Sequence, residues 1–465
     1  QAMDRTLPTA YRGAFKDADI RGVYGEEIDD DLAYRVAYAF VTQAGWQKIV
    51  IGRDVRISSP ALFEAFAAGA QDAGADVLDL GLTTSPMLYY ASGHYGLPGV
   101  MITASHSPPE YNGLKLVAPG AVPLTGKTGL SAIKQAVAKP VPARTVPRGT
   151  RRSRNIRTAY RRHILKGMRR QAMADIRIAA DAGNGMAAIL LPLLQRALPL
   201  TMDVLYGELD GRFPNRGSDP TIRAHQRALR TKLREGKYDF GIAFDGDADR
   251  IGFLDERGRY VNCAVIGALI AEHLIAAEPG AGCVCTNLTS RVYQESIEAA
   301  GGTAIRARVG HAFLKEKIAK TGAVFGCEHS GHFFFRDFYH TDSVVLTLRY
   351  VLEIYTNARQ EGRTFSELVA PYQRYQQLED QVIPVANKAA VLKHVAAHLK
   401  SHHPTARVRR FDGLYVETAT AWGAVKPSVT EHAIKVMFEG HKKRAAQTLQ
   451  QELVEVVERY AEASK

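Results

Sequence analysis

Short apolar runs alternate along most of the chain with longer stretches of helical periodicity. The apolar runs predict strands at residues 48–51, 75–80, 99–103, 175–180, 240–244 and 323–325. Residues 31–44, before the first of these runs, and residues 60–73, between the first two, repeat their apolar positions with helical spacing. This alternation predicts α/β units with buried, partly parallel sheets. In such sheets, chemistry collects in the loops at the carboxyl ends of the strands.

The pattern changes at two places, which we take as domain boundaries. Between residues 139 and 150 the composition shifts to Pro, Ala, Arg and Gly, and a strongly basic segment follows at 151–170. After residue 364 the pattern predicts a strand at 377–384, a helix at 389–400, a hairpin at 411–418 around Asp412-Gly413, a strand at 433–438 and a helix at 442–462. The tail is therefore expected to form a separate, small α+β domain.

Composition adds a hint about partners. The 465 residues include 60 Lys and Arg against 48 Asp and Glu, a net charge of +12, and 46% of them are hydrophobic. That apolar content excludes disorder as the main state, and at roughly 150 residues per domain the length suggests about three domains. The positive charge suggests an anionic partner. Because Tyr160 is the one aromatic residue within 151–170, we favour a solvated linker and exposed helix face there, and nucleic acid is not an expected partner.

The cysteines and the longest apolar run indicate the cellular compartment in which the protein is expected. Four cysteines are too few for a disulfide framework, and Cys283-Val-Cys285 lacks the second pair of a zinc site. The longest apolar run, 263–277, is interrupted by Glu272 and His273, so no membrane span is predicted. These observations favour a soluble protein of the reducing cytoplasm, with no membrane partner.

Three aspartates form the strongest chemical signal. Asp245, Asp247 and Asp249 occupy alternate positions directly after the predicted strand at 240–244. Three carboxylates in one tight loop suit a hard divalent cation, and Mg²⁺ would keep a position for a phosphate oxygen. A calcium loop needs Gly at its sixth position, where Arg250 stands. A purely structural acidic turn is disfavoured, since carboxylates packed this closely repel one another.

Two further segments follow predicted strands. Ser105 has His106 beside it and Lys115 ten residues on, which suits a nucleophile or a phosphate carrier, but the segment also reads as an ordinary Ser-Pro turn. The cluster from Cys327 to His332 suits hydrogen bonding to a polyol, but equally a loop with surface histidines. The residues alone leave both alternatives open.

In this order and spacing, the three segments resemble the α-D-phosphohexomutase family, in particular its bacterial phosphomannomutase/phosphoglucomutase branch. The resemblance extends to about Gly440 and also rests on segments 15–22, 51–60, 181–185, 213–215 and 309–311. It implies three related α/β mixed-sheet domains and a C-terminal α+β domain around a central cleft. The expected bounds are 12–150 with a phosphoserine loop, 151–254 with a metal-binding loop, 255–368 with a sugar-binding loop, and 369–465 with a phosphate-binding loop.

The resemblance also implies residue roles. Ser105 would carry the phosphoryl group and complete a Mg²⁺ site with Asp245, Asp247 and Asp249. The other catalytic positions would be Arg21, His106, Lys115 and His332. Substrate would be bound by Arg250, Val309, Gly310, His311, Glu328, Ser330, Lys426, Ser428 and Thr430. Phosphoryl transfer further needs a general acid/base, for which Lys115 and His332 are candidates, Lys115 only if its pKa is depressed.

The implied reaction moves phosphate between the 6- and 1-positions of mannose or glucose phosphates. Phosphorylated Ser105 would phosphorylate the substrate, and the bound hexose 1,6-bisphosphate, also the activator, would return its other phosphate to the serine. The partners are thus small hexose phosphates, and we expect a monomer or a weak dimer. Phosphoglucosamine mutase is the alternative within the family. The alternative from another functional class is a paralogue that binds sugar phosphates but has only weak catalytic activity.

Several positions depart from the family pattern. The family's phosphate loop reads Arg-x-Ser-Asn-Thr-x-Pro, whereas segment 426–432 begins with Lys426, has Val429 in place of Asn and adds acidic Glu431. A lysine lacks the bidentate fork of arginine, so we expect weaker anchoring of the non-reacting phosphate. Ser107 and Cys327 replace the usual Asn and Gly, and segment 286–289 lacks a frequent Lys. The hexose preference therefore stays open.

Overall fold

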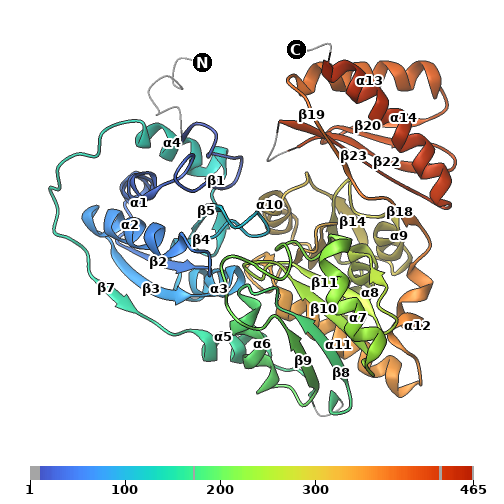
Figure 1. Cartoon of the computed structure of the whole chain (residues 1–465), viewed down its shortest axis with the longest axis horizontal. Helices are drawn as coiled ribbons and strands as arrows, with labels where there is room; N and C mark the ends of the chain where they lie inside the picture. The colour runs from blue at the N-terminus through green and yellow to red at the C-terminus, as the bar shows by residue number, and fades with distance from the viewer. Residues whose placement is uncertain (1–10, 171–172, 429–431, 463–465) are drawn as a thin grey trace. The chain divides into compact units, whose positions relative to one another are not determined.

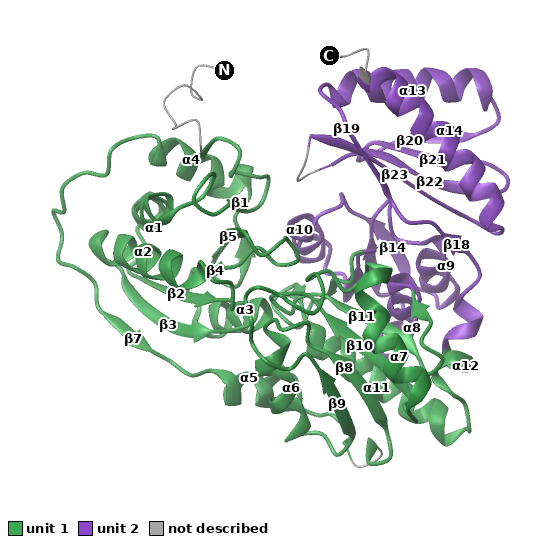
Figure 2. Ribbon diagram, viewed as in Figure 1, with its two compact units in different colours: residues 1–261, 330–368 green, residues 262–329, 369–465 purple. Residues whose placement is uncertain are grey.

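The computed structural model describes residues 11–170, 173–428 and 432–462. The chain divides into two compact units, one of residues 1–261 with 330–368 and the other of residues 262–329 with 369–465 (Figure 2).

The first sheet lies in the first unit and has the order β1-β5-β4-β2-β3-β7, with β6 paired to β5. Its strands are β1 (Ile20–Val23), β2 (Lys48–Arg53), β3 (Asp76–Leu82), β4 (Gly99–Ile102), β5 (Tyr111–Ala118), β6 (Val122–Pro123) and β7 (Arg151–Ser153). The central strands β4, β2 and β3 are parallel, whereas β5 runs antiparallel to β1 and β4. The accompanying helices are α1 (Asp30–Ala44), α2 (Ser59–Asp72), α3 (Ser85–Tyr95) and α4 (Ser131–Val137) (Figure 1).

Helix α1 shows how local sequence sets the ends of these elements. The Asp29 carboxylate accepts a hydrogen bond from Leu32 N at the start, and Gly45 ends the helix in the left-handed conformation (φ 68°). The apolar face of α1 packs on α2 and on one face of the sheet, where Phe40, Phe66 and Ile51 are buried. The buried face thus follows from the helical spacing of the apolar residues.

The second sheet of this unit has the order β12-β11-β10-β8-β9. Its strands are β8 (Arg177–Asp181), β9 (Thr201–Leu205), β10 (Phe240–Phe244), β11 (Ile251–Asp255) and β12 (Tyr260–Val261). Strand β10 is buried along its whole length, parallel to β8 and antiparallel to β11. The loop between β10 and β11 therefore leaves the carboxyl end of a central strand. The remaining elements of the unit are α5 (Arg157–Ile164), α6 (Ala187–Gln195), α7 (Arg227–Glu235), β16 (Phe333–Phe335), β17 (Thr341–Asp342) and α11 (Val344–Gln360), with α12 (Phe365–Val369) at the unit boundary.

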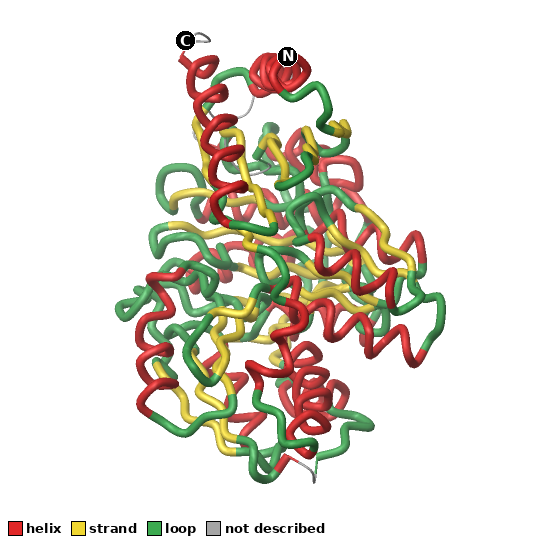
Figure 3. Tube along the Cα trace, turned by 90° about the vertical axis from the view of Figure 1, so that its right-hand side faces the viewer, coloured by secondary structure: helices red, strands yellow, loops and turns green. Residues whose placement is uncertain are grey.

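The second unit begins with a parallel group of strands, β14-β13-β15. They are β13 (Gly282–Cys285), β14 (Thr303–Arg306) and β15 (Phe325–Cys327). Helix α8 (Cys263–Ala277) precedes them, and α9 (Arg291–Ala299) and α10 (His311–Thr321) connect them. The antiparallel C-terminal sheet has the order β18-β23-β22-β21-β20, with β19 also on β23. Its elements are β18 (Gln376–Gln377), β19 (Gln381–Pro384), α13 (Lys388–His402), β20 (Arg407–Arg410), β21 (Leu414–Glu417), β22 (Ala421–Pro427), β23 (Ala433–Gly440) and α14 (Lys443–Glu462). In Figure 3, α14 is the long red helix below the C label, with yellow strands beside it.

The predicted fold class is confirmed: α/β domains with mixed sheets precede an α+β C-terminal domain. The six predicted strands correspond to β2, β3, β4, β8, β10 and β15, and their ends differ by at most two residues. The prediction of a single strand at 377–384 is wrong. This segment forms two separate short strands, β18 and β19, and each of them pairs with β23. The hairpin is centred on Asp412-Gly413, but its first strand is β20, which hydrophobic alternation misses because that strand is exposed and rich in arginine.

The basic segment 151–170 is more than the linker and exposed helix face that we predicted. Its first residues form β7, which adds to the first sheet along β3, so this sheet extends past residue 150. Arg151 pairs with Glu64 and Asp79 at 2.7 and 2.8 Å. The free edge of β3 and two carboxylates on the surface thus give this stretch regular structure.

Two further observations concern the cysteines and the helices. Cys263, Cys283, Cys285 and Cys327 are buried, and none of them forms a disulfide among the described residues. Among the described residues, none of the helices combines the length and the hydropathy that crossing a bilayer requires.

Candidate active site

Ser105 lies at the centre of the site in the first unit, in the loop that follows β4. Its backbone is in the left-handed region, with φ 52°, and its amide donates to Thr103 Oγ1 over 2.9 Å. The hydroxyl, 2% exposed as a residue, donates to Asp245 Oδ2 over 2.7 Å. The two loops that sequence analysis singled out therefore meet at this contact.

Gly246 allows the close approach of these two loops. A Cβ at this position would lie 2.5 Å from the carbonyl oxygen of Ser105. Any other residue would push the loops apart, because real Cβ atoms are not found this near a backbone oxygen. The glycine inside the aspartate loop thus has a tertiary role as well as a local one.

The three aspartates converge as the sequence predicts. Asp245, Asp247 and Asp249 are buried, and one oxygen from each lies within 4.8 Å of the others. Burial raises the pKa of Asp245 well above its ordinary value, and the neighbouring carboxylates Asp249 and Asp247 raise it further. Asp247 Oδ1 is buried and has no hydrogen-bond partner among the residues that the structure describes. An all-oxygen donor set with an orphaned carboxylate oxygen fits a divalent cation such as Mg²⁺.

Lys115 lies on β5 and faces the same carboxylates. Its Nζ is 2.6 Å from both Asp247 Oδ2 and Asp249 Oδ2. Burial lowers its pKa, but Asp247 and Asp249 raise it more, so that the pKa lies well above the ordinary value. The depressed pKa that sequence analysis required of Lys115 as general base is therefore absent, because the ammonium is paired with two carboxylates.

Arg21 and His106 flank the serine. Arg21, on β1, donates from Nη1 to Ser107 Oγ over 3.2 Å, and its Nη2 pairs with Asp19 at 2.7 Å. His106 Nδ1 lies 3.4 Å from Ser105 Oγ. Burial lowers the pKa of His106 well below its ordinary value, and the charges of Arg250 and Arg21 add to this effect. The imidazole is thus neutral beside the hydroxyl.

Arg250 and His332 form a second pair around the aspartates. Arg250 Nε donates to His332 Nε2 over 3.0 Å, which assigns the proton of a neutral imidazole to Nδ1. His332 Nδ1 lies 3.8 Å from Asp249 Oδ1 and 3.9 Å from Asp342 Oδ2. All the predicted catalytic residues therefore gather in the first unit.

The predicted substrate-binding residues of the second unit form their own cluster. Gly310 N donates to Glu328 Oε1 over 2.9 Å. Val309 N donates to Asp412 Oδ2, also over 2.9 Å. The same Asp412 oxygen lies 3.0 Å from Lys426 Nζ, and both residues are buried in this ion pair. Lys426 is thus already neutralised by a carboxylate within its own unit.

The remaining predicted positions are placed as follows. His311 is the first residue of α10, and Ser428 is buried just after β22, with its carbonyl accepting from Lys388 Nζ over 2.8 Å. Ser330 falls in the first unit, unlike Glu328. Thr430 lies outside the described residues.

Sequence reasoning missed two charged residues that hold these loops. Asp412 was noticed only as part of an Asp-Gly turn, although it pairs with Lys426. Arg56 lies under the Ser105 loop and donates to the Ser105 carbonyl over 2.8 Å. A polar residue in a turn or after a strand carries no local sign of such a partner.

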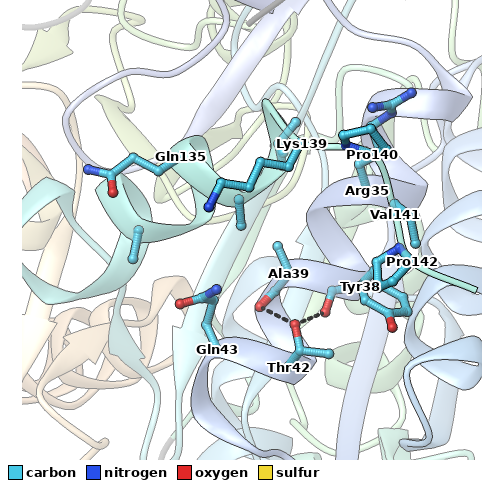
Figure 4. Close-up of a pocket in the computed structure, with 13 residues that line it drawn as sticks. Arg35, Tyr38, Ala39, Thr42, Gln43, Gln135, Lys139, Pro140, Val141 and Pro142 are labelled. Carbon is cyan, nitrogen blue, oxygen red and sulfur yellow. Dashed lines mark hydrogen bonds between the residues drawn. The ribbon is translucent and has the colours of Figure 1, made fainter. Parts of the chain in front are cut away.

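A cavity of about 470 Å³ lies elsewhere in the first unit, between α1, α4 and the segment after α4. Figure 4 shows Thr42 and Gln43 of α1 below Lys139, with Tyr38 next to Pro142 at the right. The Thr42 hydroxyl there already donates to Tyr38 O over 2.8 Å. None of the predicted site residues that the structure describes lines this cavity, so we assign it no part in the site around Ser105.

The acid stability of the second unit should depend on His329. Burial lowers its pKa to about 4, although Glu328 and Asp380 favour the protonated ring. The unfolded chain binds this proton near pH 6.5, so stability falls as the pH drops from about 6.5 to 4. The unfolding free energy of the unsubstituted protein should be lower at pH 5 than at pH 7. We expect His329→Gln to reduce this difference by about 1–2 kcal/mol.

Thermal and denaturant unfolding at the two pH values measure this difference. The control is His402→Gln, an exposed side chain at the end of α13. An acid sensitivity that is identical in His329→Gln and in the unsubstituted protein would show that another group causes it.

Family models and curated relatives match most of this chain. Residues 12–142, 158–258 and 264–375 match family models described as phosphoglucomutase/phosphomannomutase, alpha/beta/alpha domains I, II and III. A protein of Xanthomonas campestris pv. campestris (strain B100) named "Phosphohexose mutases" is 36% identical, with 86% of this chain and 88% of that protein covered. A phosphomannomutase of Salmonella typhimurium is 33% identical, with 91% and 94% covered.

A solved structure extends the similarity to three dimensions. It is a phosphoglucomutase/phosphomannomutase family protein from Burkholderia thailandensis, with a TM-score of 0.87, 27% identity, and 96% of this chain and 97% of that chain covered. The chain belongs to the phosphoglucomutase/phosphomannomutase family, within the α-D-phosphohexomutases. Its relatives are isomerases of the intramolecular phosphotransferase class, so the chain is an enzyme of that class.

Proposed function

We propose that the protein is a Mg²⁺-dependent phosphohexomutase that interconverts the 6- and 1-phosphates of mannose or glucose, with Ser105 as phosphoryl carrier. One observation carries the proposal: the Ser105 hydroxyl donates to Asp245 Oδ2 over 2.7 Å, next to two further buried carboxylates. A serine hydroxyl held beside three buried carboxylates that could bind a metal is positioned to exchange phosphate rather than to cap a turn. The named relatives, a phosphomannomutase among them, support the hexose phosphates as substrates.

The metal would be held by Asp245, Asp247 and Asp249 together with an oxygen at Ser105. When bound, Mg²⁺ supplies neutralisation of phosphate charge at the reacting serine. Arg21, next to Ser107, and Lys115 add fixed positive charge from the protein on β1 and β5. Phosphoryl transfer depends mainly on such charge neutralisation and on in-line positioning.

Each transfer step moves one phosphoryl group between two oxygens. The bond between phosphorus and Ser105 Oγ breaks as a bond to the substrate hydroxyl oxygen forms, and the proton of that hydroxyl leaves to a base. The ammonium of Lys115, bound by two carboxylates at 2.6 Å, has no lone pair to offer. His332 is the remaining candidate, but its Nε2 lone pair accepts the 3.0 Å hydrogen bond from Arg250 Nε, and this bond must be released before the ring can take the proton. The second transfer runs in reverse, from the hexose 1,6-bisphosphate to Ser105.

Sugar recognition falls to the residues of the second unit. The Glu328 carboxylate, oriented by Gly310 N, has lone pairs for sugar hydroxyls. Lys426 and Ser428 would meet the non-reacting phosphate. Because Lys426 must leave or share Asp412 to do so, we propose weak binding of that phosphate.

An assay tests the proposed activity directly. Purified protein, primed with a hexose 1,6-bisphosphate and Mg²⁺, is expected to convert mannose 1-phosphate to mannose 6-phosphate. Glucosamine 6-phosphate measured side by side distinguishes the phosphoglucosamine alternative. Calorimetric binding of these sugar phosphates without turnover would instead support the weakly active paralogue and contradict the proposal.

The ion pair between Lys426 and Asp412 leads to a prediction with a defined sign. Asp412→Asn keeps an amide oxygen for Val309 N but removes the carboxylate that competes with phosphate for Lys426. A charge-assisted hydrogen bond contributes about 1.5–3 kcal/mol, so we expect the KM for the 6-phospho substrate to fall about tenfold. Steady-state kinetics measure KM and kcat separately.

The control lies in the same unit. Glu452→Gln removes a carboxylate that pairs with His398 and His403 at 2.6 and 2.9 Å and should leave KM unchanged. A KM in Asp412→Asn that stays constant or rises would show that the Lys426–Asp412 pair does not oppose phosphate binding.

A further inference from the structure

The side chain of Arg56 is enclosed beneath the loop that presents Ser105. Arg56 follows β2, and none of its surface is exposed (0%). Its Nη1 donates to the carbonyl oxygens of Pro108 and Tyr111 over 2.6 and 3.0 Å. Its Nη2 donates to those of Ser105 and Ser107 over 2.8 and 2.7 Å. One guanidinium therefore ties four carbonyls of a single loop together.

This loop contains a strained residue that needs such support. The φ of 52° at Ser105 is unfavourable for any residue with a Cβ. The Ser105 carbonyl is held by Arg56 on one side, and on the other it faces Gly246, where a Cβ would lie 2.5 Å away. The direction of this carbonyl fixes the backbone from which the serine hydroxyl reaches Asp245.

Arg56 itself is held from two directions. Its Nε lies 3.2 Å from Asp54 Oδ2, and both side chains are fully buried. Asp54 Oδ1 in turn accepts from Ser59 Oγ over 2.5 Å and from Arg56 N over 3.0 Å. The Phe213 ring covers the guanidinium, with 5.1 Å between the guanidinium carbon and the ring centroid. A planar group with five N–H donors fits this arrangement, whereas the point charge of a lysine does not.

We propose that Arg56 is a positioning residue for phosphoryl transfer at Ser105: its four carbonyl contacts hold the serine in the left-handed conformation that directs Oγ to Asp245. Arg56 acts through the loop and not on substrate. The proposal rests on the proposed role of Ser105 as phosphoryl carrier. In-line transfer tolerates little displacement, and a shift of about 1 Å can reduce the rate about 10²-fold.

The test replaces the fork with a single amine. Arg56→Lys keeps the positive charge beside Asp54 but cannot reach four carbonyls. We expect kcat to fall about 10²-fold and KM to change by less than about twofold. The control is Arg212→Lys, an exposed arginine paired with Asp210, which should keep both constants.

Hydrogen exchange provides a readout that does not depend on turnover. In Arg56→Lys, amides of the 104–111 loop should exchange faster, while those of β2 and β4 keep their protection. If the unsubstituted protein shows no mutase turnover and no phosphate on Ser105, the proposed function fails. The exchange pattern then still decides whether Arg56 holds the loop.

Two results would overturn the proposal. One is a kcat in Arg56→Lys equal to that of the unsubstituted protein, and the other is faster exchange throughout the unit, which is the signature of a merely structural arginine. If Arg56→Lys does not fold, Asp54→Asn replaces it as a variant of the same size that removes only the partner of Nε. It should lower kcat in the same direction but less, with KM constant, and an unaltered kcat there would also refute the proposal.

Discussion

Ser105→Ala is expected to abolish mutase turnover, with a fall in kcat on the order of 10⁵–10⁶-fold, as found when a covalent nucleophile is removed. The hydroxyl that donates to Asp245 Oδ2 over 2.7 Å is the only atom of this side chain able to carry phosphate. Coupled assays of mannose 1-phosphate conversion measure the loss. Intact-mass measurement after incubation with a hexose 1,6-bisphosphate should show one added phosphoryl group in the unsubstituted protein and none in the variant.

Ser107→Ala is the matched control for this result. The Ser107 hydroxyl lies in the same loop, but its hydrogen bond is accepted from Arg21 Nη1, 3.2 Å away, and so it differs from the Ser105 hydroxyl, which donates to Asp245. Phosphorylation of Ser105 should therefore persist in Ser107→Ala. Robust turnover by Ser105→Ala would rule out the phosphoserine mechanism.

The second large effect concerns the metal. Asp247→Asn removes one of three buried carboxylates whose oxygens lie within 4.8 Å of one another. In this variant an uncharged amide replaces the Asp247 carboxylate, which makes it a weaker ligand for Mg²⁺. Loss of the metal would remove several kcal/mol of charge stabilisation, so we expect kcat to fall about 10³-fold. Calorimetric titration with Mg²⁺ measures the loss of affinity. Chelation should inactivate the unsubstituted protein to a similar extent, and added Mg²⁺ should restore it.

Asp210→Asn serves as the control for the aspartates. Asp210 pairs with the exposed Arg212 at 2.6 Å and belongs to the same unit. Its replacement should leave the Mg²⁺ affinity and kcat unchanged. Undiminished Mg²⁺ binding and turnover in Asp247→Asn would contradict the assignment of a metal to the aspartate loop.

Much of the fold could be predicted because its signals are local. The apolar run of β10 and the three aspartates that follow it are contiguous, so both the strand and the acidic loop follow from the sequence. The same holds for the strand that precedes Ser105 and for the alternation of α and β elements. Strand β20 and the separation of β18 from β19 were not predicted. Their positions depend on the strand with which each one pairs, and not on the side chains of the strand itself.

The sequence by itself determined the family, the order of the loops and the residue types that carry the chemistry, since each motif is a short contiguous stretch. Only the tertiary structure decided which charges meet. Lys115 is paired with Asp247 across 132 residues, and Arg56 supports Ser105 across 49. Lys426, on β22, is neutralised by Asp412 in the turn between β20 and β21. Such pairings, and the pKa values that follow from them, depend on distance and burial in the folded chain, which local patterns do not encode.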